Sequence, residues 1–134
     1  MLEKLQAPRR RDRGFGGKGP NARLRRVYAE PTAARLLWLV AAETGIAPEI
    51  LVSGRRGGAE AALARQMLMY LLHTLLGFDV RRVGSLLGRN RSTVDHACAV
   101  VEDRRDDAAF DRKLAQVESR FLESHRHLQE ATHG

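Results

Sequence analysis

The sequence predicts an all-α domain of six helices that contains a helix-turn-helix and follows a disordered basic arm. Apolar residues recur at spacings of three and four from Pro31 onward, which is the period of one helix face. No segment alternates apolar and polar residues in the way that a half-buried strand does. Two pairs, Gly45-Ile46 and Gly77-Phe78, have the glycine-then-apolar pattern that ends helices. We therefore expect an arm over residues 1–28 and a helical domain over residues 29–134.

The arm is rich in glycine and arginine and almost free of apolar residues, so it cannot bury enough surface to offset the entropy of ordering. Residues 1–26 hold nine Lys or Arg against Glu3 and Asp12, a net charge of +7, whereas residues 27–134 hold fourteen of each sign. Within that neutral part, residues 51–100 carry seven Arg against three acidic residues, a net charge of +4. A basic arm and a basic middle segment indicate a polyanionic partner.

The first helices of the domain follow from their apolar faces and their prolines. A helix that begins near Pro31 and ends at Gly45 has one apolar face, made of Ala33, Leu36, Leu37, Val40 and Ala41. Pro48 at a first helical position opens a short helix that runs to Val52. The next six residues, Ser-Gly-Arg-Arg-Gly-Gly, predict a mobile cationic loop.

The longest apolar helix is expected from Ala59 to Leu76. Residues 67–72 are apolar on every face, which predicts a central helix surrounded by the others. Towards the end of the chain, the alternating charges of residues 102–107 indicate a solvated helix end. A last helix then places four apolar residues at spacings of four, three and four: Phe110, Leu114, Val117 and Phe121.

Between the central and last helices, residues 79–101 predict a helix-turn-helix. Val80, Val83 and Leu87 share one helix face, and Gly88 ends that helix as a left-handed cap would. A second helix starts at Asn90 or Ser92, which are both good N-caps, and its apolar stripe is Val94, Ala97, Cys98 and Val101. In this motif the N-terminal residues of the second helix reach base edges in the major groove. Those residues can all form hydrogen bonds here: Arg89, Asn90, Arg91, Ser92 and Thr93.

Three segments taken together resemble a known family: Arg65-Gln66-Met67, then Met69-Tyr70-Leu71, and then Gly88-Arg89 through His96-Ala97-Cys98. In order and spacing they are similar to the C-terminal, DnaA-box-binding domain of the bacterial replication initiator DnaA, over roughly residues 32–122. The resemblance implies that Asn90, Arg91 and Ser92 face bases and that Arg56 enters the minor groove. It also implies phosphate contacts by Arg65, Gln66, Thr93 and His96. We expect the neighbouring cations Arg55, Arg81 and Arg89 to contact phosphates as well.

Three positions depart from the usual pattern of that family. Asn90 stands in place of an Asp, Arg91 in place of a His, and Asp95 in place of an apolar residue. Asn pairs best with adenine and Arg with guanine, whereas Asp accepts a hydrogen from cytosine, so these substitutions change which bases are preferred. The resemblance implies binding to double-stranded DNA at DnaA-box-like sites, in control of chromosome replication initiation or transcription, with the full-length initiator as a further partner. The initiator's nucleotide-binding domain has no counterpart here, so no nucleotide is expected.

Other classes of function lack the residues they need. No nucleophile has a plausible base and no paired carboxylates lie in an apolar setting, so we expect no enzyme. His96 and Cys98 have no second pair at ligand spacing, so neither a metal nor another cofactor is expected. Gly16-Gly17-Lys18 lacks the first glycine and the Ser or Thr of a phosphate loop.

The same features predict where the protein works. The longest apolar run, Met67 to Leu72, is shorter than the roughly 18 residues that span a bilayer, so no membrane partner is expected. The single cysteine fits a reducing cytoplasm, and the cationic segments suggest association with the nucleoid. Two other functions stay open: a protein-interaction adaptor without base recognition, favoured by Asp95, and a non-specific nucleic-acid binder that uses the arm. Trp38 lies either in the core or at a partner surface.

Overall fold

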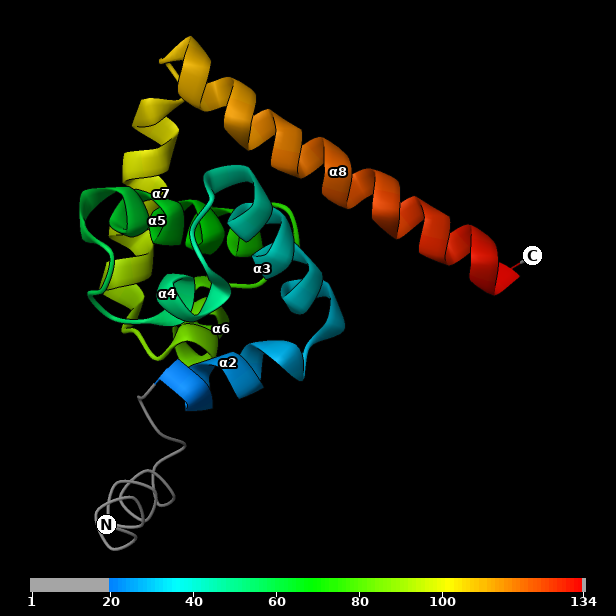
Figure 1. Ribbon diagram of the computed structural model, residues 1–134, viewed down its shortest axis with the longest axis horizontal. Helices are drawn as coiled ribbons and strands as arrows, with labels where there is room; N and C mark the ends of the chain where they lie inside the picture. Colours follow the sequence, from blue (N-terminus) through cyan, green and yellow to red (C-terminus); the bar gives the residue numbers. More distant parts are fainter. Residues whose placement is uncertain (1–19, 134) are drawn as a thin grey trace, which may run out of the picture.

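The computed structural model describes residues 20–133, which form seven helices and no strand (Figure 1). The all-α fold predicted from the sequence is confirmed. The helices, in chain order, are α2 (Pro20–Tyr28), α3 (Pro31–Thr44), α4 (Pro48–Val52), α5 (Gly58–Thr74), α6 (Val80–Leu87), α7 (Arg91–Arg104) and α8 (Ala108–His133). Six of them are the predicted ones, and α2 is additional.

Helix α2 corrects the predicted boundary of the arm. Pro20–Tyr28 is helical and packs on α3, α4 and α6, with Val27 only 1% exposed. The glycine-rich composition that predicts disorder ends at Gly19, and the apolar residues Leu24 and Val27 that follow have the spacing of a helix face. Contacts with the other helices therefore stabilise a short cationic helix, although the composition of residues 1–28 as a whole predicts disorder. Residues 1–19 of the predicted arm lie outside the described part of the chain.

Helix α5 occupies the centre of the fold, as predicted, and contacts α3, α4, α6 and α7. Its residues 67–72 are all buried, which explains why this segment is apolar on every side. The predicted faces of the neighbouring helices are confirmed as well, because the five apolar residues predicted for α3 and the four predicted for α8 are all buried. Cys98 is the partial exception: it is only half-buried, while Val94, Ala97 and Val101 on the same stripe are fully buried.

Helix α8 is much longer than its buried stripe requires and extends away from the rest of the domain (Figure 1). Arg105, in the turn after α7, joins three helices: its guanidinium donates to Asp111 and Glu118 of α8 and to the hydroxyl of Tyr70 on α5. Trp38 on α3 is 56% exposed, which rules out the core position that the sequence left open. Within residues 20–133, no helix is long and apolar enough to cross a membrane.

The helix-turn-helix is formed by α6 and α7 with a very tight connection. Gly88 ends α6 at φ 68°, the left-handed cap predicted from the sequence. The N–H of Arg89 donates to the carbonyl of Gly84 at 2.8 Å. A Cβ on Gly84 would lie 2.5 Å from the carbonyl oxygen of Arg89, so only glycine allows this close approach of the turn to α6.

Candidate nucleic-acid interface

Asn90 caps the predicted reading helix. Its Oδ1 accepts hydrogen bonds from the backbone N–H of Thr93 at 2.9 Å, from the hydroxyl of Thr93 at 2.9 Å and from the hydroxyl of Ser92 at 2.8 Å. This confirms one of the two N-caps that the sequence left open. It also occupies the amide oxygen of Asn90, so only the side-chain NH₂ group remains for a base. Arg91, the first residue of α7, is exposed and forms no such contact.

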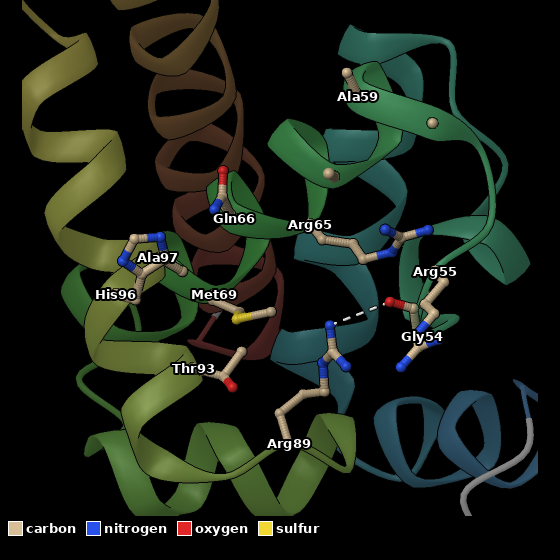
Figure 2. Close-up of a pocket in the computed structure, with 12 residues that line it drawn as sticks. Gly54, Arg55, Ala59, Arg65, Gln66, Met69, Arg89, Thr93, His96 and Ala97 are labelled. Carbon is tan, nitrogen blue, oxygen red and sulfur yellow. Dashed lines mark hydrogen bonds between the residues drawn. The ribbon is translucent and has the colours of Figure 1, made fainter.

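A groove of about 410 Å³ separates the first half of α7 from the loop before α5 (Figure 2). Figure 2 shows Thr93 and His96 of α7 on one side and Arg55, Arg65 and Arg89 converging near Gly54 on the other. The residues that line it are Gly54, Arg55, Gly58, Ala59, Ala62, Arg65, Gln66, Met69, Arg89, Thr93, His96 and Ala97. Six of the seven predicted phosphate contacts therefore surround one groove, although they come from three separate segments of the chain.

A second hollow, of about 580 Å³, lies beside the turn of the helix-turn-helix. Arg81 of α6, the seventh predicted phosphate contact, lines it together with the predicted base readers Asn90 and Arg91. Arg89 and Thr93 line both hollows, so the two form one continuous surface around the start of α7. The other two predicted readers line neither hollow. Ser92 is exposed on α7 and Arg56 is exposed on the loop.

Arg65 has a different position from the other predicted phosphate contacts. Its side chain is 5% exposed, and its guanidinium donates to the carbonyl of Ile50, to the hydroxyl of Ser53 and to the carbonyl of Arg56. Three hydrogen-bond acceptors around one rigid guanidinium fix the path of the loop backbone. We infer that Arg65 acts mainly by positioning Arg55 and Arg56.

The loop itself is tied at several points, in contrast to the mobile loop that its composition predicts. Ser53 is buried and its hydroxyl accepts from the N–H of Arg56 at 3.2 Å. Arg89 of the helix-turn-helix donates to the carbonyl of Gly54 at 3.2 Å, shown as the dashed line in Figure 2. The turn that precedes α7 and the cationic loop are thus held in one arrangement.

Residues 34–101 match the family model of the bacterial DnaA protein helix-turn-helix. That range is 68 of the 134 residues, and it covers most of α3, all of α4 to α6, α7 up to Val101, and both hollows. The chain belongs to this DnaA helix-turn-helix family. No curated protein matches the chain significantly.

The match to the DnaA helix-turn-helix confirms the resemblance on which the site prediction rests. The family is a DNA-binding domain and not a catalytic one, and its helix-turn-helix corresponds to α6 and α7 of this chain. Membership in this family supports DNA as a partner of the chain. Within residues 20–133, no group of three or more His, Cys, Asp or Glu side chains is placed to hold a metal ion.

Helix α2 lies outside the segment that matches the DnaA family. Its arginines belong to the segment predicted as a disordered arm, and the sequence does not predict that they pack against the domain. Arg23 is 8% exposed and donates from Nη1 to the carbonyl of Val52 at 3.2 Å, and Arg26 donates from Nε to the carbonyl of Leu86 at 3.3 Å. Pro20 at a first helical position was the available signal for this helix. The burial of arginine gives no sequence signal, because arginine is mostly exposed in folded proteins.

Burial and, after it, neighbouring arginine charges lower the pKa of Arg23 and of Arg65. The pKa of Arg23 is lowered first by burial and then by the charges of Arg89 and Arg26. The pKa of Arg65 is lowered by burial and then by Arg89 and Arg23. Within residues 20–133, none of Arg23, Arg65 and Arg89 pairs with a carboxylate. This side of the interface is therefore strongly electropositive.

Proposed function

We propose that this protein binds double-stranded DNA sequence-specifically, with the first turn of α7 in the major groove. The observation that carries the proposal is the exposed polar start of α7 between two cationic hollows. An α-helix with its side chains is about 10–12 Å in diameter and the major groove is about 12 Å wide, so the exposed start of α7 can enter the groove. In this proposal the turn at Gly88 directs the first turn of α7, and not the middle of that helix, towards the bases.

Arg91 is the main reader in this proposal. It can donate two hydrogen bonds to the O6 and N7 of guanine, which is the commonest specific contact of arginine with a base. Asn90 and Ser92 contribute less to base contacts than Arg91, because Asn90 Oδ1 accepts from Thr93 and from the hydroxyl of Ser92 in the helix cap. Asn90 then acts through its NH₂ group, which can donate to an acceptor on a purine.

The cations around α7 position the protein on the duplex. We propose that Arg55, Arg81, Arg89, Gln66, Thr93 and His96 contact phosphates, and that Arg56 enters the adjacent minor groove. A narrow minor groove has an enhanced negative potential that attracts arginine. The loop tied by Arg65 and Arg89 supplies a rigid base for that insertion, which limits the entropy lost on binding.

The biological role proposed here follows from the family. Binding at DnaA-box-like sites suits the control of replication initiation or of transcription in the bacterial cytoplasm, at the nucleoid. On such sites the protein competes or cooperates with the full-length initiator. Asp95 is exposed on α7, and it is the feature that favours the alternative of an adaptor that binds protein in place of DNA.

Two arginines that line the same hollow test the assignment of readers. We expect Arg91→Ala to lose roughly 1–3 kcal/mol of discrimination between the preferred duplex and one changed at a single base pair. Arg81→Ala removes the same charge, and we expect it to weaken both duplexes equally, since phosphate contacts carry no sequence information. Fluorescence anisotropy at one salt concentration measures both. Equal losses on the two duplexes for Arg91→Ala would show that Arg91 does not read a base.

A further inference from the structure

Arginine side chains from α2 and from the helix-turn-helix crowd around two glycines. The position that a Cβ would have on Gly54 lies 3.5 Å from Nη1 of Arg23 and 3.7 Å from Nη1 of Arg89. The corresponding position on Gly88 lies 2.8 Å from Nε of Arg23 and 3.2 Å from Nη2 of Arg26. The guanidinium of Arg23 therefore lies beside that of Arg89 at Gly54 and beside that of Arg26 at Gly88, where α2, the loop and the turn before α7 come together.

Packing alone does not account for this arrangement. Arg23 is more than nine-tenths buried, yet its Nε is a buried donor with no hydrogen-bond partner within residues 20–133. Its neighbour Arg89 carries the same charge and donates to a backbone carbonyl rather than to a carboxylate. An unpaired buried donor and close like charges both cost free energy unless a group of opposite charge compensates them. The arrangement thus favours an anion with several acceptor oxygens.

We propose that Arg23, Arg26 and Arg89 form a phosphate-binding site that holds one backbone phosphate of the bound duplex. The inference rests on the proposed function and extends it, because α2 lies outside residues 34–101 that match the DnaA family. A planar guanidinium matches the geometry of a phosphate and can donate two parallel hydrogen bonds to it. Several such groups around one point hold a phosphate in a fixed place.

The position of the site indicates DNA as the source of the phosphate. Arg89 belongs to the cluster and also lines both hollows beside α7. A phosphate at the cluster therefore lies next to the surface that contains Arg91 and Thr93. Gripping the backbone at this point fixes the depth and register of α7, which makes α2 a part of the DNA-binding unit.

The salt dependence of duplex binding tests the site. We expect Arg23→Met to reduce the change in affinity between about 50 mM and about 200 mM salt by about 3.5-fold, the effect of neutralising one phosphate fewer. Methionine fills the space of the arginine stem without its charge. Arg25→Met is the matched control: Arg25 is exposed on the same helix, and its substitution should leave the dependence nearly unchanged. Arg23→Lys keeps a positive charge and should recover most of the wild-type dependence. A wild-type salt dependence in Arg23→Met overturns the proposal.

Inorganic phosphate provides a second measurement that does not need DNA. At low millimolar concentration, and against chloride at the same ionic strength, we expect phosphate to raise the Tm of the wild type and of Arg25→Met but not of Arg23→Met. No rise in the wild type contradicts the site, even if Arg23→Met does not fold. A phosphate effect that depends on Arg23, in a protein that binds no duplex, contradicts both the proposed function and the DNA source and assigns the site to a free anion.

Discussion

Val94→Asp should unfold the domain, which is the largest effect that we expect from a single substitution. Val94 has no exposed surface, and α7 packs chiefly on the central helix α5. A carboxylate buried at this apolar position without a paired cation costs several kcal/mol, or it must take up a proton. Because the total stability of a domain is only about 5–15 kcal/mol, most of the population should be unfolded. Circular dichroism and a thermal melt measure the loss directly.

Asp95→Leu is the matched control on the next residue of the same helix. Asp95 is exposed, so its replacement should leave the Tm close to that of the wild type. Removing a negative charge beside the phosphates should also strengthen binding to DNA. If Val94→Asp melts like the wild type while Asp95→Leu unfolds, α7 is rotated about its axis and the assignment of its reading residues fails.

Deleting residues 1–19 should lower affinity for DNA by a large factor and leave the fold intact. This segment holds six Lys or Arg against Glu3 and Asp12. Each phosphate that the protein no longer neutralises reduces the slope of log affinity against log salt by about 0.9, so removal of six cations would reduce it by up to about 5. The preferred site should stay the same, because neutralising phosphates carries no sequence information. Titrations at several salt concentrations measure the slope.

A longer deletion, of residues 1–28, distinguishes the contribution of residues 1–19 to DNA binding from the contribution of α2 to stability. It also removes α2, whose Val27 is buried against the core. Burying a valine contributes about 1.5–3 kcal/mol, so this deletion should lower the Tm while the shorter one should not. An unchanged salt slope after removal of residues 1–19 would show that the arm contacts something other than DNA.

The sequence is most informative here where local chemistry determines the backbone. Gly45 and Gly88 end their helices in the left-handed conformation that glycine favours, and Asn90 caps α7 through its side chain. Pro48 opens α4, and the apolar stripes of α3, α5 and α8 face the core as their spacing predicts. Each of these features depends on residues close together in the chain.

The features that the sequence does not predict depend on contacts between distant segments. Helix α2 is stabilised by packing on α3, α4 and α6, and the 53–57 loop is held by Arg65 and Arg89. A cationic side chain looks the same in the sequence whether it is solvated, like Arg55, or buried, like Arg65. Resemblance and charge therefore supply the candidate readers and most of the candidate phosphate contacts, while the positioning role inferred for Arg65 and the cluster around Arg23 depend on the structure.

The most direct test of sequence-specific duplex binding is the affinity of the wild-type protein for three probes at near-physiological salt. The probes are a duplex with a DnaA-box-like site, a scrambled duplex of the same composition, and a single strand of the first. Specific binding is typically 10³–10⁷ tighter than non-specific binding, so we expect the first probe to be preferred by at least about 10³-fold. Equal affinity for all three probes would contradict sequence-specific binding in favour of a non-specific binder, and no binding to any of them would favour an adaptor.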